Sequence, residues 1–449
     1  MNKDFDKYDK APSNFCLMPY LHKAIDGNGD FKPCCVGDTH VLENGKEANI
    51  NYIDFDTFIA SKENKDFKQK FKNNERSELC TRCWDVDDHQ GESHRKRVMT
   101  FFMNKSWEGG ESKIYSLLEG YFAGNVEWQA VQNELDSVDA PWDLEIEPGT
   151  TCNFKCHFCG PHASSSWISD QKELYGTTAA EAAKATKMGH WALDSNLWHS
   201  DVMYNGKKFH LMGGEPMLIN SHFKFLEKLA TRPDADKIRM SYNTNASTLP
   251  PMNVLQNTYD KFYSTRVAFS IDGIKDKFYY QRFPGNWAEA EANIETWITN
   301  VKNIEAKIDP GWSVMNLLDI AELFLWADGI KRKFNLTDKQ FDFDGHYYFG
   351  PYYCPQSLKP EQKQKYKTKM LADLELLRSS NLTKRMMDRA EITVENMINH
   401  MMAKDTWSQE TEDMRNYRFR GLDRIRKQSL ADYLPEVNNI LGVYAIQES

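Results

Sequence analysis

Short apolar segments alternate with longer amphipathic segments through the middle of the chain. The apolar segments are rich in β-branched and aromatic residues and run into polar residues or glycine, which predicts strands. The predicted strands are residues 208–212, 238–242, 266–270, 311–318 and 341–349. Apolar residues three and four positions apart predict helices at 164–173, 221–230, 287–304 and 321–334. This alternation predicts an α/β fold with a parallel sheet and right-handed crossovers.

The two ends of the chain have different patterns. Residues 106–139, 358–382 and 393–440 have helical periodicity, and the last two segments are highly charged. Near the N-terminus, the turn-forming run 26–30 lies between apolar segments and predicts a hairpin. This hairpin would bring Cys34 and Cys35 beside Cys16.

Three cysteines, Cys152, Cys156 and Cys159, are spaced Cys-x3-Cys-x2-Cys. Thiolates are the soft ligands that iron–sulfur clusters need, and three of them leave the fourth iron of a cubane open to another ligand. The alternatives are buried structural thiols or a zinc loop, in which His157 or His162 would supply the fourth ligand.

This loop, with Phe158 just before its last cysteine, resembles the cluster loop of the radical S-adenosylmethionine (radical SAM) family. The resemblance implies that the free iron of a 4Fe-4S cluster chelates the amino and carboxyl groups of S-adenosylmethionine. It also implies that an electron from the cluster splits the sulfonium to a 5'-deoxyadenosyl radical. Phe158 would pack on the adenine.

The predicted strand 208–212 runs into Gly213-Gly214-Glu215-Pro216, where two glycines allow the backbone to approach a ligand closely. Such a sequence is by itself more often a turn. Because it follows the cysteine loop, however, it resembles the family's GGEP motif. The resemblance implies that Gly213, Gly214 and Glu215 bind the methionyl amine.

Polar residues also follow the next predicted strands. By the same resemblance, Asn243, Ser270 and Asp272 would lie near the carboxylate and ribose of S-adenosylmethionine, and Asn316 near its ribose or adenine. The alternative for Asn243, Ser270 and Asp272 is a capping side chain at a strand-to-helix turn. Six strand–helix units fit the family's fold, a partial (β/α)6 TIM-like barrel with ligands at the carboxyl ends of its strands.

Five further cysteines lie before the predicted barrel: Cys16, Cys34, Cys35, Cys80 and Cys83. Four thiolates from these segments would make a closed site, either a structural zinc or a fully ligated iron–sulfur cluster. Segments 14–20, 30–35 and 79–84 resemble the twitch or SPASM type of auxiliary 4Fe-4S domain. The resemblance implies that Cys34, which follows proline, is the ligand beside Cys16, Cys80 and Cys83, with Cys35 as the alternate.

The predicted domains are an auxiliary-cluster domain at 1–105, a helical connector at 106–139, a radical SAM barrel at 140–355 and a helical C-terminal region at 356–449. In the best known members of the family the auxiliary domain follows the barrel, whereas here it precedes it.

The composition fits a cytoplasmic enzyme. The chain has 449 residues, enough for two or three domains, and a formal charge of −9, which argues against nucleic acid as a partner. No segment has the length of a membrane-spanning helix, and the start of the chain has no apolar signal region. Cysteines at ligand spacings fit a reducing compartment better than a disulfide framework.

The resemblance therefore implies an oxidoreductase of the radical SAM type that abstracts hydrogen from a peptide or protein. A nucleotide, a sugar or another small metabolite is the alternative substrate, and a zinc-stabilised binding module is the non-enzyme alternative. The resemblance implies a reductant such as flavodoxin or ferredoxin. No catalytic side chain is assigned.

Overall fold

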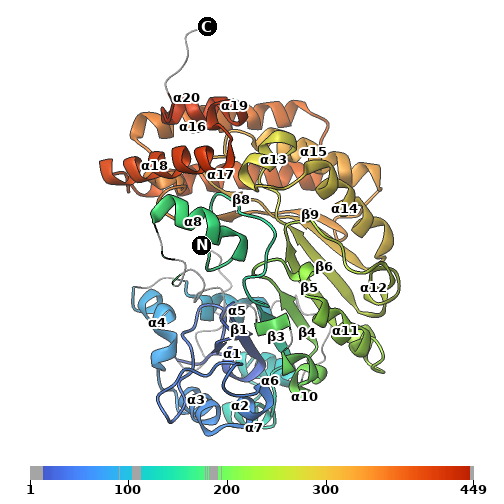
Figure 1. Ribbon diagram of the computed structural model, residues 1–449. Helices are drawn as coiled ribbons and strands as arrows, with labels where there is room; N and C mark the ends of the chain where they lie inside the picture. The colour runs from blue at the N-terminus through green and yellow to red at the C-terminus, as the bar shows by residue number, and fades with distance from the viewer. Residues whose placement is uncertain are drawn as a thin grey trace. The chain divides into compact units, whose positions relative to one another are not determined.

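The structure is a computed structural model (Figure 1) that describes residues 14–89, 92–103, 113–176, 178, 181, 191–193 and 195–444. The chain divides into two compact units, and each is described by itself. The first unit comprises Met1–Thr150, Met188–Ser241 and Lys261–Ser264. The second unit comprises Thr151–Lys187, Tyr242–Asp260 and Thr265–Ser449. The boundary thus falls inside strand β5 (Arg239–Thr244).

The first unit contains the predicted hairpin. Strands β1 (His22–Ile25) and β2 (Phe31–Lys32) pair antiparallel, with Ala24 opposite Lys32. Asp26 Oδ1 accepts the backbone amides of Asn28 (2.9 Å) and Asp30 (3.1 Å), an Asx-type turn that explains why this polar run reverses the chain. The prediction of a hairpin at 26–30 is confirmed.

Parallel strands follow this hairpin in the sheet of the first unit. Strand β1 pairs with β3 (Asp143–Ile146), and β3 pairs with β4 (Lys208–Leu211). The predicted strand at 208–212 is confirmed, whereas β3 was not predicted. The β1–β3 pair joins residues from the predicted domains 1–105 and 140–355 in one sheet, and the predicted domain boundaries themselves stay a prediction.

Helices surround these strands. They are α1 (Met18–Leu21), α2 (Phe55–Ala60), α3 (Lys62–Lys72), α4 (Thr81–Asp88), α5 (His94–Met103), α6 (Lys113–Phe122), α7 (Trp128–Asp136), α10 (Asp201–Asn205) and α11 (Asn220–Leu229). Apolar faces of α6 and α7 are buried in a core cluster with α1 and α3. The predicted connector 106–139 contains α6 and α7, joined by a turn at residues 123–127, and its residues 106–112 lie outside the described residues.

The second unit holds parallel strands. Strands β6 (Ser264–Phe269), β7 (Ile304–Ile308) and β9 (Phe341–Phe343) pair in that order, and β8 (Gly311–Trp312) pairs with β10 (His346–Tyr347). Strands β5 and β6 confirm the predicted strands at 238–242 and 266–270. The mainly parallel α/β class is therefore present, and the closure into a partial (β/α)6 barrel stays a prediction.

Of the predicted strand at 311–318, only Gly311–Trp312 form a strand, the short β8, and the prediction is wrong for residues 313–318. The longer strand, which was not predicted, is β7, where buried Ile304, Ala306 and Ile308 alternate with half-buried residues, the period of a strand. Residues 313–318 are all buried, and their backbone makes turns such as Asn316 N to Ser313 O (3.2 Å). An apolar run without alternation was therefore mistaken for a strand, and the helix predicted to reach residue 304 ends at residue 300.

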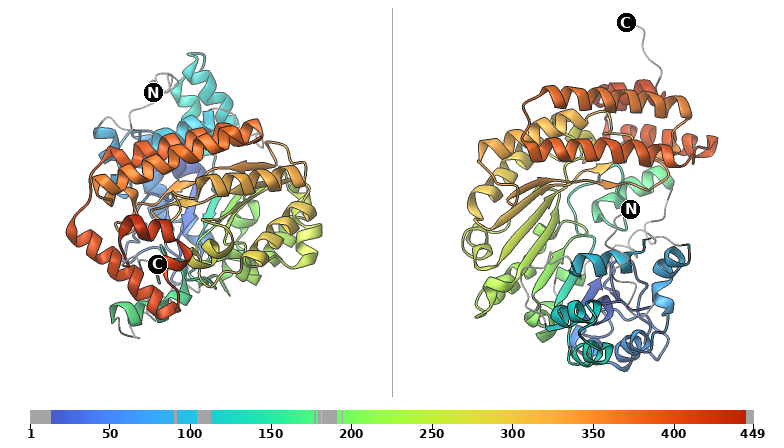
Figure 2. Two further views of the ribbon diagram at one scale, coloured as in Figure 1. Left: turned by 90° about the horizontal axis from the view of Figure 1, so that it is seen from above. Right: turned by 180° about the vertical axis from the view of Figure 1, so that it is seen from behind.

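The helices of the second unit are α8 (Ile168–Tyr175), α12 (Met252–Asn257), α13 (Lys275–Gln281), α14 (Trp287–Asn300), α15 (Ile320–Lys333), α16 (Pro360–Ser379), α17 (Lys384–Ala403), α18 (Gln409–Arg426), α19 (Leu430–Tyr433) and α20 (Pro435–Leu441). Figure 2 shows α16 and α17 side by side. Helix α17 starts earlier than the predicted residue 393, because Met386 and Ala390 extend its buried face. No helix in the described part of the chain is long and apolar enough to cross a membrane.

The predicted strand at 341–349 is broken in two, β9 and β10, by residues 344–345. A Cβ at Gly345 would lie 2.3 Å from Trp312 Nε1 and 2.7 Å from the Pro310 carbonyl. The chain can therefore pass β8 at this point only with glycine.

We expect Gly345→Ala to lower the free energy of unfolding by roughly 1–3 kcal/mol, because a methyl group there displaces a ring and a carbonyl. Gly329→Ala is the matched control: it lies in α15, where a Cβ would meet nothing within 4 Å, and should raise that free energy by about 0.5–1 kcal/mol. Chemical denaturation measures both. Equal effects would contradict the close approach of Gly345 to Trp312.

Candidate functional site

The cysteine loop of the second unit, residues 152–159, is held by hydrogen bonds to its backbone. The indole Nε1 of Trp167 donates to the carbonyl of Cys156 (2.9 Å). The amide of His157 donates to the carbonyl of Gln281, the last residue of α13 (2.9 Å). The loop is thus fixed by two segments that follow it in the sequence.

A buried arginine of α18 also holds the loop. Arg418 Nη2 donates to the carbonyls of His157 (2.8 Å) and Cys159 (2.9 Å), and its Nε donates to the Tyr353 hydroxyl (3.0 Å). Its Cζ lies 4.6 Å from the centre of the Trp167 ring, where a guanidinium stacks favourably. One side chain of the C-terminal region therefore orients the carbonyls of the two residues on either side of Phe158.

A buried ion pair between α8 and α18 also lies beside Trp167. Arg426 Nε lies 2.9 Å from Asp170 Oδ2, and both side chains are 1% exposed. Arg426 Cζ lies 5.1 Å from the centre of the Trp167 ring, and Lys155 Nζ lies 2.7 Å from Asp170 Oδ1. Buried charges need such partners, so α8, α18 and the cysteine loop form one connected structure.

Nitrogen donors face two of the three sulfurs. Asn245 Nδ2 lies 3.8 Å from Cys152 Sγ, and Arg282 Nη1 lies 3.8 Å from Cys156 Sγ. Burial, and then Cys156, raise the pKa of the Cys159 thiol to about 12, while Arg282 acts in the opposite direction. Thiolates in this loop need cations for stability. Three soft donors in a short loop with N–H groups at their sulfurs fit an iron–sulfur cluster.

Arg282 links the loop to predicted site residues. Its Nε lies 2.6 Å from Asp272 Oδ2, and its Cζ lies 5.4 Å from the centre of the Phe158 ring. The other carboxylate oxygen of Asp272 accepts the amide of Gly311 (2.7 Å), at the start of β8. Asp272 therefore holds Arg282 and β8 in place. Its predicted contact with the cofactor stays a prediction.

The side-chain amide of Asn316 also forms hydrogen bonds with nearby backbone groups. Its Oδ1 accepts the amide of Ser313 (2.8 Å), and its Nδ2 donates to the carbonyl of Gly311 (3.0 Å). Asn243 is the second-last residue of β5, and Ser270 directly follows β6. Asn243 and Ser270 thus lie at carboxyl ends of strands, where ligands bind in such folds. Their roles stay predictions.

The GGEP segment belongs to the first unit and follows β4. Gly213 has φ +75°, and a Cβ there would lie 2.9 Å from Glu147 Cβ, so both conformation and space require glycine. Glu215 is buried, and its Oε1 accepts the amide of Met217 (3.0 Å). The segment is a tight turn with a buried carboxylate, and its contact with a methionyl amine stays a prediction.

Four of the five N-terminal cysteines line one cavity of the first unit: Cys16, Cys34, Cys80 and Cys83. Met18, Phe71 and Trp84 are among its apolar walls, and the cavity volume is about 20 Å³. Burial and the neighbouring thiols raise the pKa of Cys80 to about 12. Four converging soft donors fit a closed, fully ligated cluster.

Cys35 does not line this cavity. It is exposed, and its Sγ lies 3.7 Å from His94 Nε2. This placement agrees with Cys34 as the ligand, although the assignment stays a prediction.

Local contacts explain why these segments converge. The amide of Asp38 donates to the carbonyl of Leu79 (2.9 Å), which ties the chain after Cys34 to the chain before Cys80. Arg95 Nη1 donates to the carbonyl of Phe15 (2.8 Å) and thereby fixes the residue before Cys16.

His157, a candidate ligand in the zinc alternative, packs among aromatic rings. His157 is buried, and its ring centre lies 4.5 Å from that of Tyr280 and 5.8 Å from that of Phe419. Among the residues that the structure describes, no three His, Cys, Asp or Glu side chains are arranged around a single metal ion.

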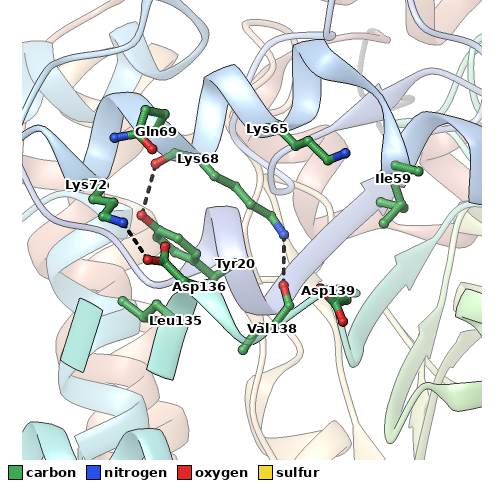
Figure 3. A pocket seen from close by; sticks show the side chains of 11 residues that line it. Tyr20, Ile59, Lys65, Lys68, Gln69, Lys72, Leu135, Asp136, Val138 and Asp139 are labelled. Atoms are coloured by element: carbon green, nitrogen blue, oxygen red, sulfur yellow. Dashed lines mark hydrogen bonds and ion pairs between the residues drawn. The ribbon is translucent and has the colours of Figure 1, made fainter. Parts of the chain in front are cut away.

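Another cavity, of about 350 Å³, lies between α3 and the end of α7 (Figure 3). Lys72 Nζ lies 2.5 Å from Asp136 Oδ2, Lys68 Nζ donates to the Val138 carbonyl (3.2 Å), and the Tyr20 hydroxyl donates to the Lys68 carbonyl (3.0 Å). These contacts join α1, α3 and α7. No predicted site residue lines this cavity.

Comparisons with known proteins give a distant likeness. No protein-family model matches the chain, and no curated protein gives a significant match. Streptococcus suis SuiB bound to S-adenosylmethionine is 15% identical, with a TM-score of 0.32 over 65% of this chain and 62% of that chain. SuiB bound to precursor peptide SuiA is 16% identical, with a TM-score of 0.33 over 64% and 62%. TYW1 with a lysine-pyruvate adduct bound is 14% identical, with a TM-score of 0.27 over 54% and 76%.

The chain thus spans less than two thirds of the length of SuiB. TM-scores this low carry no argument about the fold or activity of this chain.

From the sequence, neither Arg282 nor Arg418 is assigned a role at the cysteine loop. Neither lies in a motif, and both reach the cysteine loop only through tertiary contacts. Charged residues inside otherwise amphipathic helices, such as Arg418 beside Phe419 in α18, would have been the available signal.

We expect Arg418→Met to lower the free energy of unfolding by roughly 2–3 kcal/mol, because two loop carbonyls lose a charged donor. Iron bound after anaerobic reconstitution should fall with it. Arg424→Met, an exposed arginine of the same helix, is the control and should change neither quantity. Unchanged unfolding and iron content in Arg418→Met would contradict the role of α18 in holding the loop.

Proposed function

We propose that the chain is a radical SAM enzyme. The observation that carries the proposal is the loop of Cys152, Cys156 and Cys159, which is rigidly held and has N–H donors at two sulfurs. Three thiolates would hold three irons of a 4Fe-4S cluster and leave the fourth for S-adenosylmethionine. When bound, this pair supplies reductive cleavage of the sulfonium and a 5'-deoxyadenosyl radical that abstracts hydrogen from a substrate.

The chain's own residues would bind and orient this cofactor. Phe158 offers a ring for the adenine, and Arg282 holds that ring from one side. Gly213, Gly214 and Glu215 would receive the methionyl amine at a turn that admits no side chain at Gly213. Asn243 and Ser270 would meet the carboxylate and ribose from strand ends.

Asp272 and Asn316 would act on the cofactor indirectly, through the groups that they bind. Their polar atoms bind Arg282 and the backbone around β8. We therefore propose that these two residues position Arg282 and the loop after β8, and that their contribution to S-adenosylmethionine binding passes through this arrangement.

We also propose an auxiliary 4Fe-4S cluster on Cys16, Cys34, Cys80 and Cys83. Four cysteines would occupy all four irons, which suits electron exchange with a substrate radical better than ligand binding. The support is their convergence on one cavity with apolar walls. A twitch or SPASM-like identity for this region rests on the resemblance of its motifs.

The proposed substrate is a peptide or protein, because auxiliary-cluster domains of this type accompany such enzymes. A nucleotide, a sugar or another metabolite is the second candidate. Release of 5'-deoxyadenosine that depends on an added peptide would favour the first, and dependence on a small metabolite alone would favour the second. Electrons would come from flavodoxin or ferredoxin, in a cytoplasm that keeps the thiols reduced.

We expect Cys159→Ala to lower 5'-deoxyadenosine formation from S-adenosylmethionine and dithionite by more than about 100-fold, because the cluster loses one of three ligands. Cys354→Ala is the control, since this buried thiol lies outside both cysteine groups. Chromatography of the quenched reaction measures the product. Undiminished cleavage in Cys159→Ala would contradict the assignment of this loop.

The auxiliary site gives a second prediction. Cys34→Ala should lose about four irons after reconstitution, whereas Cys35→Ala should retain them, because only Cys34 lines the cavity. Iron and sulfide analysis measures both variants in parallel. The reverse pattern would make Cys35 the ligand.

A further inference from the structure

A lysine is buried in the first unit without an acidic partner. Lys23, in β1, is 1% exposed. Its Nζ donates to the carbonyl of Pro19 (3.2 Å) and lies 5.6 Å from the centre of the Phe67 ring. Among the described residues, no carboxylate forms an ion pair with it. Burying a charge in this way is costly, so the position calls for a source of negative charge.

The titratable neighbours of Lys23 include another lysine and two of the cysteines. Burial, and then the like charge of Lys68, lower the pKa of Lys23 to about 7, whereas Cys34 and Cys80 act in the opposite direction. Burial, and then the charge of Lys23, lower the pKa of His40. The geometry links Lys23 to the cysteine site: its Nζ donates to the carbonyl of Pro19 (3.2 Å), and Pro19 lines the cavity of Cys16, Cys34, Cys80 and Cys83.

Arg95 is a second cation near the cysteine site, but unlike Lys23 it has an acidic partner among the described residues. It interacts electrostatically with Cys16, but its Nη2 lies 2.6 Å from Asp87 Oδ2, so a carboxylate already balances its charge. No carboxylate in the described part of the chain balances Lys23 in this way. Its charge is therefore available to the cysteine site.

We propose that the Lys23 ammonium is the counter-charge of the auxiliary cluster and raises its reduction potential. This inference rests on the proposed ligation by Cys16, Cys34, Cys80 and Cys83. An oxidised 4Fe-4S cluster with four thiolates has a net charge of about −2, and reduction adds one more negative charge. A nearby cation in a low-dielectric interior stabilises the reduced form more than the oxidised form.

The test uses the full chain with Cys152, Cys156 and Cys159 all changed to Ala, so that only the auxiliary cluster remains. Lys23→Met is added to this parent, and the midpoint potential is measured by redox titration followed by electron paramagnetic resonance. The expected result is a shift to more negative potential at unchanged iron content. Lys62→Met, an exposed lysine of α3, should leave the potential of the parent unchanged.

A potential in Lys23→Met that equals or exceeds that of the parent overturns the inference. If Lys23→Met assembles no cluster, cluster assembly is compared between Lys23→Arg, which keeps the charge, and Lys23→Gln, which removes it. A cluster in the arginine variant alone supports a role for charge, and a cluster in neither overturns it. An iron-free parent, by contrast, would contradict the proposed auxiliary cluster itself, so the two failures are distinguishable.

Discussion

Buried thiols with few compensating charges are the constraint on which both cysteine groups depend. A thiolate in an apolar interior is unstable unless a metal, a cation or an N–H donor balances it. In the second unit, Arg282 and Asn245 face the sulfurs of the cysteine loop. In the first unit, Lys23 donates to the carbonyl of Pro19, which lines the cavity of Cys16, Cys34, Cys80 and Cys83. Each group is thus arranged for an anionic centre.

The second unit adds mechanical support to this electrostatic arrangement. Arg418 and Arg426 of α18 contact the same indole, and Arg418 binds two carbonyls of the cysteine loop. A cluster loop must keep its sulfurs in place as ligands bind and leave, and buried guanidinium groups with several acceptors provide that stiffness. The C-terminal helices therefore belong to the proposed active site as its support.

Local sequence signals predicted much of the fold and little of the site's support. Strands at β4, β5 and β6 were found because each has its own apolar run that ends in polar residues. Strand β7 was missed because its alternation is short and a longer apolar run follows it. The cysteines themselves were identified by spacing alone.

Arg282, Arg418 and Lys23 were not predictable in this way. Their significance comes from neighbours that are distant in sequence, such as Cys156 for Arg282. Likewise, the sequence motifs predict that Asp272 and Asn316 contact S-adenosylmethionine. In the structure, Asp272 binds Arg282 and the amide of Gly311, and Asn316 binds the backbone of Gly311 and Ser313. Motifs reveal which residues carry chemistry, but the groups that hold them emerge only from tertiary packing.

The most direct test is iron and sulfide analysis with electron paramagnetic resonance on the anaerobically reconstituted chain, with and without S-adenosylmethionine. The Cys152→Ala, Cys156→Ala, Cys159→Ala triple variant serves as the comparison. We predict about eight irons per chain, half of them lost in the triple variant, and a reduced signal that S-adenosylmethionine changes only when the three cysteines are present. Zinc without iron after careful reconstitution would contradict the account.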